Sequence, residues 1–474
     1  MKRKLIRDIS INTLQVIINQ LSGLVIFYVL SAFFSKNDFG EINWSLAILL
    51  TAFSILSLGI DQVTVKKIAA GEDARSVLSL YMTHVALAGG LFYSFLLVAW
   101  FIFPSLQHHY LLLFFGIGKL MIFFSTPFKQ LANGLEKFKA LFYMAVCSNI
   151  IRSTCLIIFS FFSTPVLTTV IVIFISGDVA ELLVSFFITN KILKNPLSVR
   201  PDKINYLSLL RESLPQAGVA IFTSAIARFD WIILGILASN IIVAEYSFAF
   251  KVFEITTLPL LIIAPLLIPL FTRLYLNTVK PSKEKINYLF ILLRVEMIGS
   301  SLIALLLNIL WIPVIDFITN GKYGHVNTYT ILILSACMPL IYVNNFFWTI
   351  NFAKGELKKI FYIFFITFLI NVICDITLIP FFKAEGAAIG YFAAIFIQFI
   401  LFRMKTDLHD EKNYGYSIII CPMAAFISGI IATQCFNSIF FILIMSVLFF
   451  FLIIFFCRQL RFSDWLTIRR LLAL

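Results

Sequence analysis

The sequence contains few charged residues for its length. Only 13% of its 474 residues are charged, whereas 61% are hydrophobic and 53 are phenylalanine. Polar side chains are therefore too scarce to cover the surface of a water-soluble globule of this size. The composition excludes a soluble globular protein and predicts a chain that is embedded in a lipid bilayer.

The chain also lacks the patterns that hold metal ions or carry out catalysis. Its seven cysteines lie in apolar segments without a CxxC pair, and its five histidines form no HExxH motif or triad-like cluster. We therefore expect no disulfide framework, no metal site and no cofactor. Enzyme chemistry has little support in the sequence.

Long apolar runs take the place of these features. We predict an all-α polytopic membrane protein with about fourteen transmembrane helices, because roughly fourteen segments reach the ~20 residues needed to cross hydrocarbon. The segments lack the sustained alternation of β-barrel strands. The predicted spans are 9–33, 42–65, 79–104, 110–130, 141–162, 165–190, 214–237, 243–270, 287–316, 327–352, 358–380, 384–403, 414–434 and 437–457.

Basic residues are distributed unevenly between the predicted loops. Most of the 37 Lys and Arg fall on one side, whereas the loops of the other side hold Lys36, Lys322 and Lys383. Because short cytoplasmic loops retain basic residues, this asymmetry predicts that both chain ends are cytoplasmic. It also explains the net charge of +13 through contacts with anionic lipid, without nucleic acid.

A long connection divides the chain after six predicted spans. Residues 191–213, KILKNPLSVRPDKINYLSLLRES, contain two prolines and form the expected cytoplasmic linker. It separates an N-terminal six-helix lobe, 1–190, from a C-terminal six-helix lobe, 214–405. Two additional helices and a basic cytoplasmic tail follow in 406–474. Because six is even, both lobes would have the same orientation, related by an axis along the membrane normal.

Several patches resemble one transporter family. They are FGEINWSL at 39–46, LGIDQVTVKKIA at 58–69, ARFDWIILG at 227–235, VAEYSFAFKVFEITTLPLLIIAPLLIPLFTRL at 243–274 and NVICDITLIPFFKAEGAA at 371–388. Together with the span count they resemble the Wzx-type polysaccharide (O-antigen) flippases, which belong with MurJ and the MATE exporters to the MOP superfamily. Ala244 and Lys383 stand where the family pattern has glycine.

This resemblance implies a mechanism and a substrate. Two six-helix lobes would surround a central cavity that opens alternately to each side of a bacterial inner membrane. The cargo would be a polyprenyl-pyrophosphate-linked oligosaccharide, moved from the cytoplasmic to the outer leaflet during O-antigen or capsule synthesis. Membrane lipid and polysaccharide polymerase machinery are the other expected partners.

Basic residues inside the predicted spans suit a pyrophosphate. A charge at the bilayer centre costs about 2.5–3.5 kcal/mol, so such side chains face the protein interior or pair with an acid. Arg228, with Ser224 and Trp231 at helical spacing, is the first candidate for headgroup contact, and Arg152 is the second. A salt bridge to another span is the alternative for both. The remaining basic residues within spans are Lys119, which an interhelical partner fits equally well, Lys251, which Glu254 can neutralise, and Arg294, which can snorkel.

Polar side chains within spans suit a sugar. Asn12 and Asn19 lie on one helical face of the first span, and Trp348 lies among asparagines of the tenth. Amide and aromatic groups can hydrogen-bond and stack on sugar rings. Amides also tie transmembrane helices together, which is the alternative interpretation.

Three buried acids are candidates for ion coupling. Asp178 and Glu181 lie three residues apart on the predicted sixth span, and Asp375 lies near Asn371 on the eleventh. Carboxylates that change protonation or hold sodium are a usual means of coupling transport to an ion gradient. A structural ion pair with Arg152 or Lys119 fits Asp178 and Glu181 equally well.

Two other functions share some of these features. A multidrug or cation antiporter of the same superfamily would need an acidic or apolar cavity for cationic drugs, whereas basic residues at depth favour an anionic substrate. A membrane glycan polymerase would carry catalytic groups in a large outer loop. The longest predicted outer loop, 317–326, is too short for that role.

Overall fold

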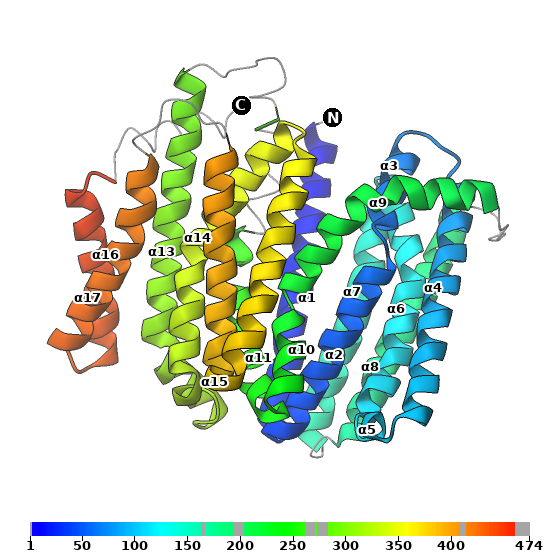
Figure 1. Ribbon diagram of the computed structural model, residues 1–474, viewed down its shortest axis with the longest axis horizontal. Helices are drawn as coiled ribbons and strands as arrows, with labels where there is room; N and C mark the ends of the chain where they lie inside the picture. The colour runs from blue at the N-terminus through cyan, green and yellow to red at the C-terminus, as the bar shows by residue number, and fades with distance from the viewer. Residues whose placement is uncertain are drawn as a thin grey trace. The chain divides into compact units, whose positions relative to one another are not determined.

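The fold is helical throughout the part of the chain that the structure describes. This structure is a computed structural model of the protein, and it describes residues 2–162, 166–193, 203–260, 267, 271–272, 283–406 and 414–459. Eleven helices in these ranges are long and apolar enough to cross a membrane (Figure 1). The predicted all-α polytopic membrane fold is confirmed.

The chain forms two compact units, of which the first comprises residues 1–244. Within it α1 packs against α7, α6 packs against α4 and α8, and α9 lies against α2, α3 and α4. Its helices are α1 (Lys2–Phe33), α2 (Lys36–Leu56), α3 (Ile60–Ala69), α4 (Ala74–Ile102), α5 (Pro104–Gln107), α6 (Tyr110–Gly134), α7 (Phe138–Phe162), α8 (Leu167–Leu193), α9 (Lys203–Ile226) and α10 (Phe229–Leu237).

The second unit comprises residues 245–474, and α11 (Asn240–Thr256) enters it across the boundary. Its main core joins α13, α14 and α15 around buried residues such as Met297, Phe346 and Phe402. A smaller apolar cluster joins α13 to α16 and α17. The helices are α13 (Lys283–Thr319), the 3-10 turn η1 (His325–Asn327), α14 (Thr328–Ala353), α15 (Leu357–Lys405), α16 (Tyr414–Cys435) and α17 (Ile439–Phe456).

The remaining predicted spans are helices that are interrupted or incompletely described. The long α15 contains two helices joined at Lys383, whose φ of 50° is the left-handed conformation that glycine adopts most readily. The predicted span 214–237 is divided between α9 and α10. The predicted span 243–270 begins as α11, and part of it lies outside the described residues.

Two of the predicted spans are wrong as continuous helices. The span 42–65 ends as α2 at Leu56, and α3 starts at Ile60 after a turn in which Leu58 and Gly59 have positive φ. The span 214–237 breaks at Ala227 and Arg228, where Arg228 has φ −142°. Each interruption is only two or three residues long, so hydropathy averaged over a ~20-residue span does not reveal it.

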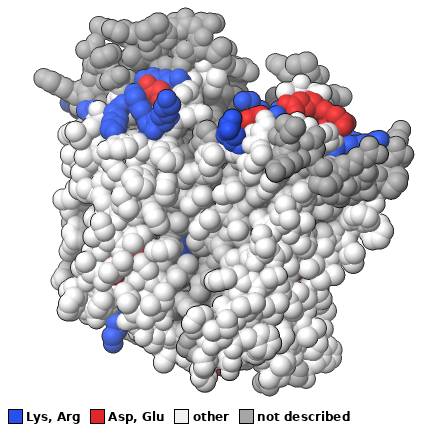
Figure 2. All heavy atoms as spheres, turned by 45° about the vertical axis from the view of Figure 1, so that its right-hand side comes forward, with Lys and Arg blue, Asp and Glu red and all other residues white. Residues whose placement is uncertain are grey.

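Charged side chains gather at helix ends. In the first unit, Lys67 lies at the end of α3, Arg75 at the start of α4 and Lys191 in the last turn of α8. Figure 2 shows charged side chains near one end of the visible face, while the flank is almost entirely uncharged. An uncharged flank fits contact with lipid hydrocarbon.

The predicted linker is only partly described. α8 ends at Leu193 and α9 begins at Lys203, while residues 194–202 lie outside the described ranges. The first half of α9 is held against the first unit by an ion pair between Lys67 and Glu212, at 3.1 Å. The predicted lobes 1–190 and 214–405 and the C-terminal part 406–474 stay predictions.

Candidate functional site

Five charged side chains meet in the interior of the first unit. The Asp178 carboxylate pairs with the Arg152 guanidinium, and the Lys119 ammonium lies 3.6 Å from the same carboxylate. The Glu181 carboxylate pairs with the Lys129 ammonium at 2.6 Å. We call these five residues, from α6, α7 and α8, the charge cluster.

Hydroxyl groups complete the surroundings of the charge cluster. Ser125 and Ser148 both donate hydrogen bonds to Glu181, the first at 3.2 Å. The Arg152 guanidinium also lies over the ring of Phe174, 5.0 Å from its centroid. The alternative prediction, that Asp178 pairs with Arg152 and Lys119, is confirmed. The proposed roles of Arg152, Asp178 and Glu181 in transport stay predictions.

A glycine on α6 makes the close approach of α8 possible. A Cβ atom on Gly118 would collide with the Asp178 carboxylate. Gly118 belongs to the sequence GIGK, 116–119, which lies inside α6 and so has no phosphate-loop geometry. Its role is steric, because it leaves room for the carboxylate that pairs with Lys119.

The charge cluster borders a small cavity with both polar and apolar lining residues. This cavity has a volume of about 210 Å³, smaller than a drug-sized site. Its polar lining residues are Lys119, Asp61, Ser54, Ser57 and Thr126, and the others are apolar. Asp61 accepts a hydrogen bond from the Tyr81 hydroxyl. Lys119 thus has one carboxylate on its buried side and an opening with hydroxyl groups on the other.

Arg228 occupies the break between α9 and α10. It is half-buried, its Nη1 donates to the carbonyl of Ala227 at 2.9 Å, and its Cζ lies 4.5 Å from the centroid of the Trp231 ring. The prediction that Ser224, Arg228 and Trp231 share the face of one helix is wrong, because Ser224 lies on α9 and Trp231 on α10. The neighbouring Asp230 is buried and accepts a hydrogen bond from its adjacent backbone amide.

The other predicted residues of the first unit are the asparagines of α1. Asn19 accepts a hydrogen bond at 3.1 Å from Asn149 on α7, which is the helix-joining contact given as the alternative. Asn12 is exposed. Their proposed contacts with sugar stay predictions.

The second unit contains the remaining predicted residues at separate places. Lys251 pairs with Glu254 at 2.8 Å, as the structural alternative predicted. Asp375 is fully buried and accepts a hydrogen bond at 3.1 Å from Asn371. Trp348 stacks on Phe352, with 5.0 Å between ring centroids. Arg294 is half-buried on α13. Ligand contact for these residues stays a prediction.

Helices α2 and α10 interlock within the first unit. The Trp44 indole donates to the carbonyl of Ile232 at 3.2 Å, and its ring covers Gly235, where a Cβ atom would collide with it. Beside this contact, His109 lies 3.7 Å from Glu41 and its ring centroid lies 4.6 Å from that of Trp44. Burial lowers the pKa of His109, and the neighbouring His108 lowers it further.

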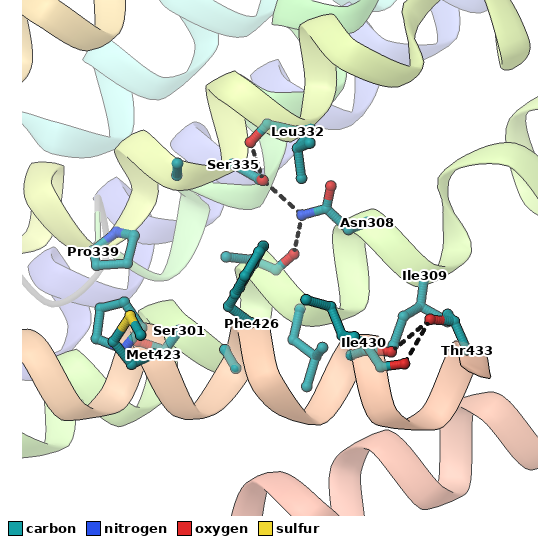
Figure 3. Close-up of a pocket in the computed structure, with 16 residues that line it drawn as sticks. Ser301, Asn308, Ile309, Leu332, Ser335, Pro339, Met423, Phe426, Ile430 and Thr433 are labelled. Carbon is teal, nitrogen blue, oxygen red and sulfur yellow. Dashed lines mark hydrogen bonds between the residues drawn. The ribbon is translucent and has the colours of Figure 1, made fainter. Parts of the chain in front are cut away.

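The second unit has a larger, mainly apolar cavity between α13, α14 and α16. Its volume is about 420 Å³. Figure 3 shows Asn308 at its wall, donating to Ser335 Oγ at 2.6 Å and to the carbonyl of Ala304 at 2.8 Å. Pro339 lies toward one end and Thr433 toward the other. Most other lining side chains are aliphatic or aromatic, so the cavity suits a hydrocarbon chain.

Sequence reasoning missed Lys129 as a member of the charge cluster. Its position at the end of a predicted span made it a loop lysine, whereas α6 continues to Gly134. The available signal was its spacing from Ser125, which puts both residues on one face of α6, and both contact Glu181. Within the described residues, no group of three or more His, Cys, Asp or Glu side chains is placed to hold a metal ion.

Comparisons with solved structures identify the fold. The chain is similar to the lipid II flippase MurJ in an inward closed conformation, with a TM-score of 0.72 and 13% identity, over 94% of this chain and 98% of that one. It is similar to an inward-facing multidrug resistance MATE family transporter of the MOP superfamily, with a TM-score of 0.66 and 14% identity, over 82% and 94%.

A third solved structure has the same fold. It is a MOP superfamily transporter from Pyrococcus furiosus, with a TM-score of 0.57 and 14% identity, over 85% of this chain and 95% of that one. No curated protein matches the sequence. The model of a family described as polysaccharide biosynthesis protein matches residues 5–275, more than half of the chain. The chain therefore belongs to the polysaccharide biosynthesis protein family and has the fold of MOP superfamily transporters.

Proposed function

We propose that the protein moves polyprenyl-pyrophosphate-linked oligosaccharide repeat units from the cytoplasmic to the outer leaflet of a bacterial inner membrane. The family match over residues 5–275 carries this proposal, because it joins the transporter fold to polysaccharide biosynthesis. The units would serve O-antigen or capsule synthesis and pass to polymerase machinery. Both chain ends would be cytoplasmic, as the distribution of basic residues predicts.

The headgroup site that we propose centres on Arg228, with Ser224 and Trp231 beside it. A guanidinium offers several donors in one plane and can bind two oxygens of a pyrophosphate at once. Arg228 suits this role because it is half-buried at a helix break and its charge lies against an indole face. Further contacts with the headgroup or sugar are proposed for Arg152, Lys251, Arg294, Asn12, Asn19 and Trp348.

The lipid tail of the substrate would occupy the apolar cavity of the second unit. Its walls come from the membrane-spanning helices α13, α14 and α16, and a polyprenyl chain is a hydrocarbon that would bury the aliphatic lining. Filling the cavity with Ala304→Phe should weaken transport of a polyprenyl-linked substrate more than that of an analogue with a shortened tail. If Ala304→Phe weakens transport of the two substrates equally, the cavity does not bind the lipid tail.

Coupling of transport to an ion is proposed at Asp178, Glu181 and Asp375, whose carboxylates are buried within spans. A second candidate function is export of cationic drugs. It is favoured by the fold shared with multidrug MATE transporters, although the family match favours the polysaccharide substrate.

Lipid extracts from cells that lack the protein test the proposed function. We expect single oligosaccharide units on polyprenyl pyrophosphate to accumulate and to face the cytoplasm. If no such lipid accumulates and the cells instead become sensitive to cationic drugs, the exporter function replaces the proposal.

Substitution of Arg228 tests the headgroup site. We expect Arg228→Ala to insert normally and to lose most transport of the pyrophosphate-linked substrate, with Arg228→Lys retaining part of it because a positive charge remains. The matched control is Lys358→Ala, which removes an exposed basic residue at the start of α15. Normal transport by a well-folded Arg228→Ala protein would remove Arg228 from the site.

A further inference from the structure

Glu296 on α13 is a buried carboxyl group that none of the sites above uses. Glu296 is 6% exposed, and neither of its carboxyl oxygens, Oε1 and Oε2, has a hydrogen-bond partner among the described residues. It lies beside the apolar residues Leu293 and Met297 of the main core of the second unit. A carboxylate in such surroundings would lose its hydration without gaining hydrogen bonds in return.

Most helices that pack against α13 carry no charged side chain in the part of the chain that the structure describes. They are α14, α16 and α17, and none contains Asp, Glu, Lys, Arg or His. α15 joins the same core through Phe402, but its Lys359 pairs with Glu356 and its Arg403 is exposed. The stretch 257–272, whose Leu267 and Phe271 join the same core, contains no charged residue either. On α13 itself, Arg294 lies two residues away and therefore about 200° around the helix.

Tyrosine and cysteine side chains are the titratable groups of α14 and α16 near Glu296. Tyr342 on α14 is close enough to interact electrostatically with Glu296, and its hydroxyl lies against the backbone of Leu260. On α16, Cys421 interacts with Arg294 and with Cys457, the residue that follows α17. On α14, Cys337 is buried and contacts the carbonyl of Ile333.

A single proton is the ligand that fits this arrangement. Holding a negative charge at the bilayer centre costs about 2.5–3.5 kcal/mol on insertion scales, and protonation removes that cost without any other partner. A metal cation would need several oxygen ligands, as Ca²⁺ does with six or more. The Glu296 carboxyl, the Tyr342 hydroxyl and the backbone of Leu260 together offer fewer oxygens than that.

The apolar cavity ends one to two turns from this carboxyl group along α13. Helices α13 and α14 run in opposite directions, and Ser301 and Pro339 line the cavity from these helices (Figure 3). Glu296 precedes Ser301 by five residues, about 7–8 Å along the helix and about 140° around it. Tyr342 follows Pro339 by three residues. Water from the cavity would therefore reach Glu296 only when α13 rotates or the helices beside it separate.

We propose that Glu296 is a proton-binding site of the second unit, protonated in the conformation described above and deprotonated to water when the cavity reaches it. The O–H bond of the carboxylic acid breaks, its proton passes to a water molecule to form hydronium, and the electron pair stays on the carboxylate. The reverse transfer restores the acid. Coupling of this proton to transport rests on the proposed function.

Infrared spectroscopy of the purified protein in lipid nanodiscs tests the proton directly. At neutral pH we expect a carbonyl stretching band of a protonated carboxyl group that Glu296→Gln removes and Glu296→Asp shifts but keeps. The matched control is Glu356→Gln, because the Glu356 carboxylate pairs with the Lys359 ammonium at 2.8 Å. Identical spectra for the wild type and Glu296→Gln in this band would overturn the proposal.

Reconstituted transport separates this inference from the proposed function. In proteoliposomes we expect a pH gradient to stimulate wild-type transport of the pyrophosphate-linked lipid and to have no effect on Glu296→Gln, which still exchanges substrate without a gradient. Equal stimulation of both proteins would overturn the coupling. If the wild type moves no such lipid while the infrared band still depends on Glu296, the proposed function fails and the proton site stands.

Discussion

Buried carboxylates have different surroundings in the two units. In the first unit, Asp178 and Glu181 contact basic side chains from neighbouring helices. In the second, Glu296 lies on α13, and the neighbouring helices α14, α16 and α17 carry no basic residue. A carboxyl group inside a membrane protein needs either a cation or a proton, and each unit illustrates one of these solutions. Replacing the carboxyl group by an apolar side chain should therefore have different effects on stability in the two units.

The largest effect is expected from Arg152→Met. It leaves the buried Asp178 with only Lys119 at 3.6 Å, and breaking a buried ion pair costs about 3–5 kcal/mol. The measurement is thermal unfolding of the purified protein in nanodiscs. The double variant Arg152→Met with Asp178→Leu should regain much of the loss, since both charges are then removed. A single variant as stable as the wild type would show that the charge cluster does not stabilise the fold.

Gly118→Ala should disturb the same charge cluster through packing alone. The added methyl group collides with the Asp178 carboxylate, and overpacking of this kind costs about 1–3 kcal/mol. Gly390→Ala should have a similar cost in the second unit, because its methyl group would collide with Asp375. The control is Gly90→Ala on α4, where a Cβ atom meets nothing within 4 Å. If all three variants unfold at the same temperature, the close contacts of Gly118 and Gly390 with the buried carboxylates do not contribute to stability.

A smaller effect, of opposite sign or near zero, is expected from Glu296→Leu. Replacing a buried polar group that lacks hydrogen bonds by an apolar one of similar size is about neutral, within about 1 kcal/mol, or stabilising. Asp178→Leu is the comparison, because it leaves Arg152 and Lys119 without their carboxylate and should be far less stable. Unfolding in nanodiscs measures both. Equal destabilisation by Glu296→Leu and Asp178→Leu would show that the two carboxyl groups do not differ in this way.

The smallest effect concerns the exposed end of the first unit. Burial lowers the pKa of Lys67, but the carboxylates of Glu212 and Glu72 raise it by more, so the net shift is upward from 10.5. The contact between α3 and α9 is thus fully present below pH 10.5 and is lost as pH rises through the higher folded pKa. We expect a small alkaline loss of stability that Lys67→Met abolishes, small because water screens the pair. A Lys67→Met protein with an unchanged alkaline profile would contradict this assignment.

Much of the fold could be predicted from apolar run length, because hydrocarbon thickness fixes the length of a spanning helix. The interruptions could not. Hydropathy is averaged over many residues, and Arg228 marks a break without proline or glycine beside it. The turn at Leu58 contains the one local clue, Gly59, yet it lies in an otherwise helical pattern.

The sequence predicted that Asp178 and Glu181 are buried acids, but it did not show which basic residue pairs with each. The three-residue spacing of Asp178 and Glu181 put both on one face, but which cation each meets depends on how α6 and α7 pack against α8. Lys129 was missed because the end of α6 was placed too early. Glu296 was visible as an acid near a span, whereas its lack of a partner depends on helix neighbours that one sequence does not reveal.

The interlock of α2 and α10 gives the protein an optical probe of its own. Indole fluorescence responds to the polarity around the ring, and the Trp44 ring lies buried against Gly235 with its N–H bound to Ile232. Separation of these helices would expose the ring and shift its emission. The chain has six tryptophans, so the difference between the wild type and Trp44→Phe isolates this one signal. The opening of this contact can therefore be timed in the unlabelled protein.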